Sequence, residues 1–164
     1  MADTRPPLYQ SAKTTTNGQK IILTYSEALK TATATKEAFS VKVNGVTKAV
    51  SSVVVKGNTV ELLLASAVQR GQSINVSYTD PSARNDARAI QDLAGNDAIN
   101  FRNKTVANTS TLDKVAPIYR SATTTDDGLK VILTYSEALK AITAGKDAFS
   151  LKINGVEKAF RPLP

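Results

Sequence analysis

Ile22-Leu-Thr-Tyr-Ser-Glu-Ala-Leu-Lys30 returns letter for letter as Ile132 to Lys140, 110 residues further along the chain. The repetition extends without a gap on both sides, so that residues 7–50 match residues 117–160 at 29 of 44 positions. A fixed period of this length is too long for a solenoid unit and has the size of one small domain. The sequence therefore predicts a tandem array of domains.

The phase of the repeat is set by a short segment that precedes each copy. Asp113-Lys-Val-Ala-Pro117 is the counterpart of Asp3-Thr-Arg-Pro-Pro7, so each copy begins at its aspartate. The polar, unpatterned stretch 108–117 is typical of a linker between domains. We therefore expect one complete repeat in residues 1–112 and the first half of a second repeat in residues 113–164.

Apolar residues inside the repeat recur with a period of two, which is typical of half-buried β-strands. Ile21, Leu23 and Tyr25 share one face of such a run, and Asn44-Gly45 has the residues that tolerate positive φ in a tight hairpin turn. We expect about seven strands in the complete repeat, over residues 8–14, 19–26, 40–43, 48–55, 59–65, 72–79 and 99–106.

Many short strands at regular spacing, with no long helical pattern, predict an all-β fold. The class we expect is an Ig-like antiparallel β-sandwich of about seven strands, with a truncated second copy. Residues 35–39 read as one short helical turn that places Phe39 in the core. Tyr25 lies on the apolar face of its strand, so we expect its ring in the core and its hydroxyl at the rim.

The composition excludes several kinds of chemistry. The chain has no cysteine, histidine or tryptophan, so disulfides, thiolate nucleophiles, Ser-His-Asp triads and zinc sites built on Cys or His are impossible. Carboxylate pairs remain, but none sits in an apolar setting that would raise a pKa, and we expect no enzyme.

The net charge of +7 comes mostly from lysines spread singly, without interleaved aromatic residues, which predicts no nucleic-acid binding. No apolar run is long enough for membrane insertion.

Several motifs of the chain are shared with a known repeat. Residues 22–29, 38–41 and 43–45 resemble the first half of bacterial Ig-like repeats, and residues 71–81 and 89–97 resemble the second half. Their combination is similar to the repeat of cyanobacterial swimming-motility surface proteins, a flagellar-system-associated repeat. The resemblance covers nearly all of residues 3–112 and, truncated, residues 113–161. It implies a very large exported protein of the cell surface, built from tandem β-sandwiches and acting in motility or adhesion.

The irregular loop 80–97 gathers half of the acids of the first repeat. Oxygen ligands without nitrogen or sulfur suit Ca²⁺, which takes six to eight of them in flexible geometry. The alternative is a structural turn in Asp92-Leu-Ala-Gly-Asn96, with Asp92 accepting backbone N–H bonds and Gly95 supplying positive φ. No EF-hand or nonapeptide calcium signature is present. The loop acids that could bind calcium are Asp80, Asp86, Asp92 and Asp97.

Glu27 and its copy Glu137 follow a strand in Tyr-Ser-Glu-Ala-Leu. Glu27 is a further candidate calcium ligand or a contact between neighbouring repeats. The favoured interpretation is a carboxylate that bonds loop N–H groups where the strand ends. Asp3 and Asp113 lie at the joints between repeats, where calcium could bridge adjacent domains.

Residues 113–164 supply about three strands, too few to bury Ile132, Tyr135, Phe149 and Ile153. An uncovered β-rich half invites exchange or pairing with another chain. We therefore expect this half to be poorly ordered or paired between molecules.

The sequence as a whole favours a non-enzymatic structural repeat, a spacer or stalk module of a large secreted or cell-surface bacterial protein. Its expected partners are neighbouring repeats of the same protein. Two alternatives remain open: a calcium-dependent adhesion or binding domain, and an accessory domain of an exported hydrolase. No cofactor is certain, and Ca²⁺ is the one that the acids could bind.

Overall fold

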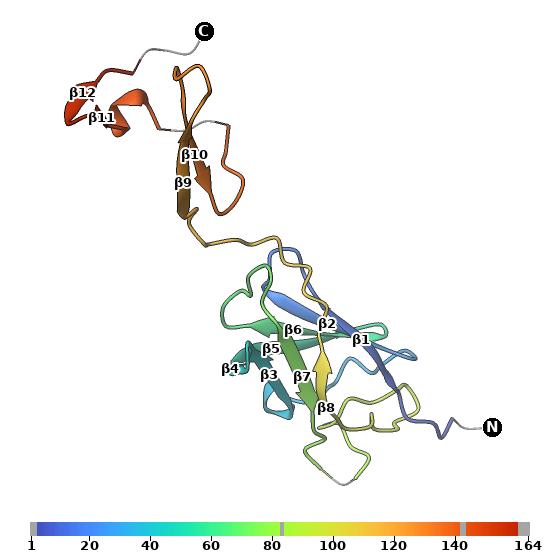
Figure 1. Cartoon of the computed structure of the whole chain (residues 1–164). Helices are drawn as coiled ribbons and strands as arrows, with labels where there is room; N and C mark the ends of the chain where they lie inside the picture. The colour runs from blue at the N-terminus through green and yellow to red at the C-terminus, as the bar shows by residue number, and fades with distance from the viewer. Residues whose placement is uncertain (1–2, 83, 142–143, 161–164) are drawn as a thin grey trace. The chain divides into compact units, whose positions relative to one another are not determined.

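The computed structural model describes residues 3–82, 84–141 and 144–160. The chain separates into two compact units, Met1–Lys114 and Val115–Pro164 (Figure 1). Strands dominate both units, and every strand pair is antiparallel. The described helices are single 3₁₀ turns, and neither has the length or apolar character that a membrane crossing requires.

The first unit contains two four-stranded sheets. One sheet has the order β1 (Tyr9–Thr14), β2 (Lys20–Tyr25), β6 (Thr59–Leu64) and β5 (Val50–Lys56). The other has the order β4 (Val46–Lys48), β3 (Phe39–Val43), β7 (Ile74–Tyr78) and β8 (Phe101–Thr105). This is the strand order of an Ig-like sandwich with one added edge strand, so the predicted fold class is confirmed.

The added edge strand is β4, which the sequence did not separate from the strand after it. Asn44 and Gly45 both have positive φ, at 50° and 82°, and form the tight turn that folds β4 back onto β3. The predicted short helical turn is present as η1 (Lys36–Ala38), directly before the buried Phe39. The first unit therefore has eight strands where seven were expected.

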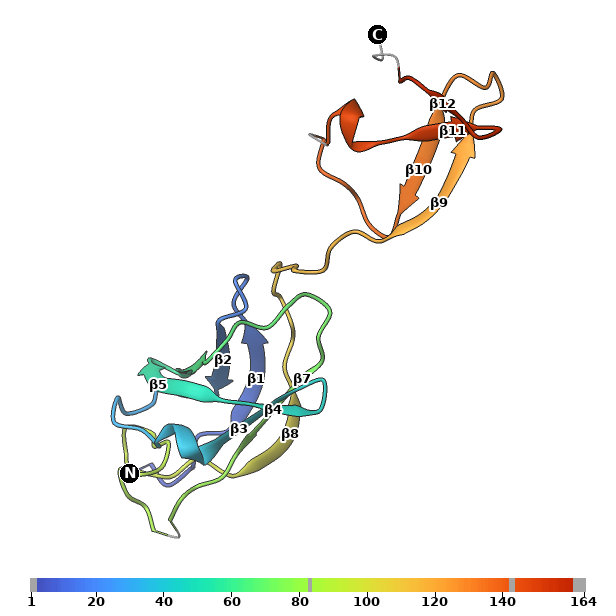
Figure 2. The same cartoon turned by 90° about the vertical axis from the view of Figure 1, so that its left-hand side faces the viewer.

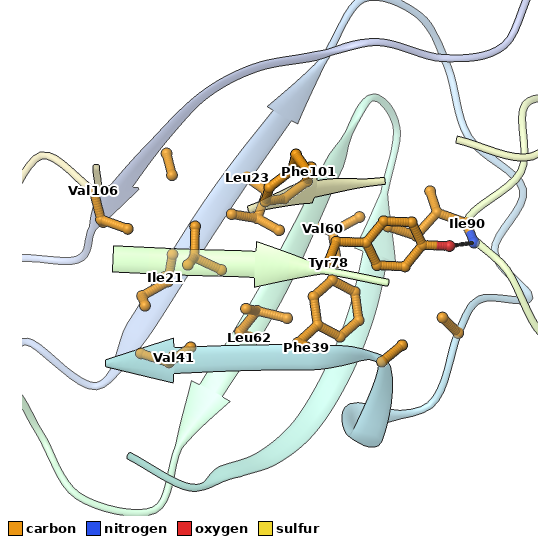
Figure 3. Close-up of a cluster of buried hydrophobic side chains, with 14 of the residues drawn as sticks. Ile21, Leu23, Phe39, Val41, Val60, Leu62, Tyr78, Ile90, Phe101 and Val106 are labelled. Carbon is orange, nitrogen blue, oxygen red and sulfur yellow. Dashed lines mark hydrogen bonds between the residues drawn. The ribbon is translucent and has the colours of Figure 1, made fainter. Parts of the chain in front are cut away.

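The core lies between the two sheets and is built mainly from alternate residues of the central strands β2, β6, β3 and β7 (Figure 3). On the β2–β6 pair, Ile21 lies opposite Leu62 and Leu23 opposite Val60, and all four side chains are fully buried. Tyr25 is fully buried as well. Its hydroxyl group has no hydrogen-bond partner among the described residues, so the prediction of a hydroxyl at the rim was wrong.

Residues 107–112, here called the tail segment, continue β8 and run beside β1. Ala107 forms a parallel bridge with Lys13, and Thr111 N–H donates to the Thr16 carbonyl at 2.8 Å. Arg70 N–H donates to the Leu112 carbonyl at 2.8 Å. The interpretation of residues 108–112 as linker was therefore wrong, because their side chains and backbone form hydrogen bonds with the sandwich.

The second unit repeats the first four strands (Figure 2). β9 (Tyr119–Thr124) pairs with β10 (Val131–Tyr135), and β11 (Leu151–Ile153) pairs with β12 (Val156–Lys158). The turn η2 (Lys146–Ala148) precedes Phe149 as η1 precedes Phe39. Large apolar residues of this unit are exposed, as expected for half of a sandwich.

Candidate functional site

Three carboxylates meet where the first unit begins: Asp3, Glu27 and Asp92, here called the acidic cluster. One carboxylate oxygen from each residue lies within 4.8 Å of the corresponding oxygens of the other two. They come from the segment before β1, the loop after β2, and the long loop between β7 and β8. The fold joins the two loops, because Leu29 forms an antiparallel bridge with Asp92.

Asp92 is buried and stabilises a tight turn. Its Oδ1 accepts the N–H groups of Gly95 at 2.6 Å and Asn96 at 2.8 Å, and Gly95 has a φ of +97°. The structural-turn interpretation of this motif is therefore confirmed. Burial alone would raise the pKa of Asp92, but the hydrogen bonds that it accepts from Asn96, Gly95 and Ala94 outweigh burial and lower that pKa. Asp92 is therefore a charged group inside the protein.

Asn96 fixes the segment that carries Asp3. Its side-chain amide donates to Asp92 Oδ2 at 2.7 Å and to the backbone carbonyls of Asp3 at 3.2 Å and Arg5 at 3.3 Å. The Asp3 carboxylate accepts the Arg5 N–H at 2.9 Å. The joint before β1 is thus docked on the loop, and no sequence pattern indicates this contact because its partners lie 91 and 93 residues apart.

Glu27 was predicted to bond loop N–H groups where its strand ends. The residue before it, Ser26, makes such a bond instead. Ser26 Oγ accepts the Leu8 N–H at 2.9 Å, and Ser26 N–H donates to the Leu8 carbonyl at 2.9 Å. Ser136 and Ile118 repeat both bonds in the second unit. Within residues 3–82, 84–141 and 144–160, no hydrogen bond reaches the Glu27 carboxylate.

The other candidate acids serve the long loop itself. Asp80 accepts the Ser82 N–H at 2.9 Å, and Asp86 accepts the Arg88 N–H at 2.8 Å. Asp97 Oδ1 accepts the Gln91 side-chain amide at 2.8 Å, and its Oδ2 is buried without a partner among the described residues. Asp92 is the loop acid that joins the acidic cluster.

The acidic cluster has the chemistry of a hard-cation site. Three carboxylates in close contact repel one another, and a cation such as Ca²⁺, which prefers oxygen ligands, would relieve that repulsion. Asp3, Glu27 and Asp92 are the residues that could hold it. The ammonium group of Lys30 lies beside Gly95, 3.2 Å from the position that a Cβ atom would take there. It supplies positive charge next to the Asp92 turn.

Comparison with known proteins gives one family and one fold. The family described as "Putative flagellar system-associated repeat" matches residues 2–83. A search of curated proteins finds no match. Among solved structures, domains 1–6 of the surface layer protein SbsC match with a TM-score of 0.50 and 18% identity, over 81% of this chain and 18% of that one. The N-terminal part of the bacterial S-layer protein SbsC matches with a TM-score of 0.49 and 19% identity, over 84% of this chain and 33% of that one. The chain thus spans between 18% and 33% of the length of these surface layer chains.

Proposed function

The chain belongs to the flagellar system-associated repeat family, and on that premise we propose that it is a load-bearing spacer module of a large bacterial protein of the cell surface. Family membership supports a part used in tandem, and the fold shared with surface layer protein SbsC supports an extracellular setting. Motility or adhesion would then be a task of the full array. Each folded repeat supplies length and resists tension between its ends.

The observation that carries this proposal is the contact between the first strand and the tail segment. The chain enters the first unit at β1 and leaves it at the opposite end (Figure 1). Thr14 N–H donates to the Ala107 carbonyl at 3.0 Å, and Ala107 N–H donates to the Ala12 carbonyl at 2.9 Å. Because the two segments run parallel, tension on the two ends loads these bonds together in shear instead of opening them one at a time.

Side chains of the tail segment extend this contact. Thr109 N–H donates to Thr14 Oγ1 at 2.8 Å, and the Thr109 hydroxyl donates to the Thr14 carbonyl. The Asn108 amide donates to the carbonyls of Gln69 at 2.8 Å and Gln72 at 2.9 Å. The tail segment is thus held by both β1 and the loop before β7, so that separating it breaks bonds to two parts of the sandwich at once.

Single-molecule stretching tests the proposal. The chain lacks cysteine, so handles can be attached through cysteines placed at residues 3 and 113. We expect one abrupt rupture that releases about 110 residues, each up to ~3.5 Å long. Thr109→Val keeps the side-chain size but removes the hydroxyl bonds, and should lower the rupture force.

The matched control is Thr47→Val on the exposed edge strand β4, away from β1 and the tail segment, which should leave the rupture force unchanged. Gradual extension at low force in the unmodified chain, or equal rupture forces for the two variants, would contradict a load-bearing role.

A second candidate function is calcium-dependent stiffening of the joint at Asp3. The observation that favours it is the Glu27 carboxylate, which faces two other carboxylates and receives no hydrogen bond from the described residues. A bound Ca²⁺ would tie the segment before β1 to both loops. Calcium at 100 times its Kd should stabilise the fold by about 2.7 kcal/mol.

Thermal unfolding of the chelator-treated chain, with and without Ca²⁺, measures this effect. Glu27→Gln should abolish the calcium-induced rise in Tm. Glu37→Gln, which removes an acid outside the acidic cluster, should preserve it. An unchanged Tm in millimolar Ca²⁺, or an equal rise in both variants, argues against the site.

A further inference from the structure

Three of the four edge strands in the first unit are protected against pairing with another chain. β1 is bonded along its edge to the tail segment, and β4 has only three residues. β8 contains Arg102 and Lys104, and its pairing with β7 shifts register beside Asn103, which has a φ of 50°. Short strands, charges and bulges are the features that keep sheet edges from joining other chains. The fourth edge strand is β5.

β5 is long, and its residues before Lys56 are uncharged. It reads Val50-Ser-Ser-Val-Val-Val-Lys56, without glycine or proline. A short segment of high β-propensity and low charge is typical of strands that pair with copies of themselves. The register shift of β5 lies between Val50 and Ser52, so its ladder from Ser52 to Lys56 is regular. The ammonium group of Lys56 lies 3.0 Å from Glu61, so its charge has a partner within the unit.

The backbone of β5 has hydrogen-bonding groups that no other strand uses. A two-residue turn joins β5 to β6, so Lys56 and Thr59 on either side of the turn form a hydrogen-bonded pair. Such pairs alternate with non-bonded pairs along an antiparallel ladder, so the N–H and C=O groups of Val53 and Val55 point away from β6. η1 and β3 also lie near β5, but in the part of the chain that the structure describes neither forms a backbone hydrogen bond with it.

The connections to neighbouring repeats begin away from β5. The strand order of its sheet places β1 at one edge and β5 at the other. The segment before β1 is bonded to Asn96 of the long loop, and the tail segment runs beside β1. The chain therefore enters and leaves the unit along the opposite edge of the sheet, which leaves β5 accessible within an array.

We propose that β5 pairs antiparallel with β5 of a second copy of this chain, around a two-fold axis that passes through Val54 perpendicular to the sheet. The two sheets would join into one sheet of the order β1-β2-β6-β5-β5-β6-β2-β1. This axis makes the two copies of β5 antiparallel and keeps both cores on the same side of the joined sheet. The contact adds a lateral partner to the spacer role, and it does not depend on how the unit resists tension.

The side chains of β5 fit this register. Residues directly opposite in an antiparallel pair point to the same face, so the axis has to pass through a residue. An axis at Val54 places Val53 opposite Val55, and their outward backbone groups then exchange hydrogen bonds across the seam. Val54 itself is 47% exposed and would be covered by its own copy. Lys56 would lie opposite Ser52, so the seam brings no like charges together.

The neighbouring registers use the edge less well. An axis at Val53 would place Ser51, at the register shift, opposite Val55. An axis at Val55 would place Gly57 of the turn opposite Val53. Only the axis at Val54 keeps every pair between residues 52 and 56 within the regular ladder.

A seam of five residues on each strand is a weak contact between single repeats, because stable interfaces bury about 1,200–2,000 Å². A tandem array would multiply it, since pairing of one repeat brings the next pair together at a high effective concentration. We therefore expect association of the 164-residue chain at high protein concentration. This multiplication rests on the proposed spacer array, whereas the contact between two single chains does not.

Capture by disulfide formation tests the register directly, because the chain lacks cysteine. Val54→Cys should link two chains rapidly under mild oxidation, since opposed Cα atoms of a non-hydrogen-bonded pair lie about 4.5 Å apart. Ser52→Cys is the matched control. It is exposed on the same strand and face, but its Cα would stand about 14 Å from its own copy. Val54→Cys linking no faster than Ser52→Cys would overturn the proposal.

A charge exchange at the axis tests the association itself. Val54→Lys and Val54→Glu each place like charges opposite one another, and each variant alone should have a lower weight-average mass in sedimentation than the unmodified chain. An equimolar mixture of the two variants should restore association. Other contacts between chains affect the mixture and its components equally. A mixture whose mass equals the mean of the two separate variants would contradict the pairing of β5 with its copy.

Discussion

Tyr25 and Tyr78 carry the same side chain into the same core, but their hydroxyl groups have different surroundings. Tyr78 Oη accepts the buried N–H of Ile90 at 3.0 Å and so attaches the long loop to the end of β7 (Figure 3). Tyr25 Oη is buried with no partner among the described residues. Burial raises the pKa of both phenols, that of Tyr78 to about 12, so neither ionises near neutral pH.

The pair gives a matched test of these hydrogen bonds. Tyr78→Phe leaves the Ile90 N–H buried without an acceptor and should lower the free energy of unfolding by about 1–3 kcal/mol. Tyr25→Phe removes a hydroxyl that has no partner and should be neutral or slightly stabilising. Urea unfolding of the two variants checks both values. Equal losses would show that the two hydroxyls have equivalent environments.

Asp92 makes the stability of the fold depend on pH in the acidic range. Its pKa is lowered in the folded state, so its contribution to stability is fully present above the unfolded-state value of about 4 and is lost as pH falls through the folded-state value. In the presence of chelator, Asp92→Asn should lower Tm at pH 6 and flatten the fall in Tm between about pH 4 and pH 2. Parallel Tm curves for the two proteins would contradict this assignment.

At the scale of elements, the sequence predicted those strands and turns that depend on neighbouring residues alone. The strands with alternating burial, the turn before Phe39 and the Asp92 turn all follow from neighbouring residues. β4 was missed because Val46 and Thr47 are both exposed, which leaves no alternation to detect. Residues 108–112 of the tail segment were taken for linker because their hydrogen-bond partners lie far away in the sequence, near residues 14–16 and 68–72. The acidic cluster joins three distant segments, so sequence spacing could name its acids but not bring them together.

Gly18 and its copy Gly128 test which copy of the repeat packs against residues 51–112. Both have a φ of +68°, but a Cβ atom on Gly18 would stand 2.0 Å from the Val68 carbonyl oxygen, whereas nothing lies within 4 Å at Gly128. Gly18→Ala should therefore cost about 2–5 kcal/mol, from backbone strain and overlap together. Gly128→Ala should leave the stability of the first unit unchanged. Urea unfolding monitored by far-ultraviolet circular dichroism measures the difference, and similar losses in both would mean that residues 51–112 are shared between the two copies.

At the scale of the whole molecule, the chain divides into two compact units. The first unit has a core closed by its own eight strands, and both its entry and its exit are held by hydrogen bonds within the unit. A load-bearing spacer needs this independence, because a repeat that depended on its neighbour would lose its fold when tension separated the two. The second unit repeats the first four strands, and several of its large apolar side chains are exposed.

The most direct test of this independence is urea unfolding of a chain that ends at Lys114, compared with the 164-residue chain. We predict that the shorter chain folds alone and unfolds in one cooperative transition. Its midpoint should match that of the first unit in the longer chain, read from a probe in β2. A shorter chain that is unfolded, or that unfolds at a clearly lower urea concentration, would show that the first unit needs residues beyond Lys114 and would contradict the account.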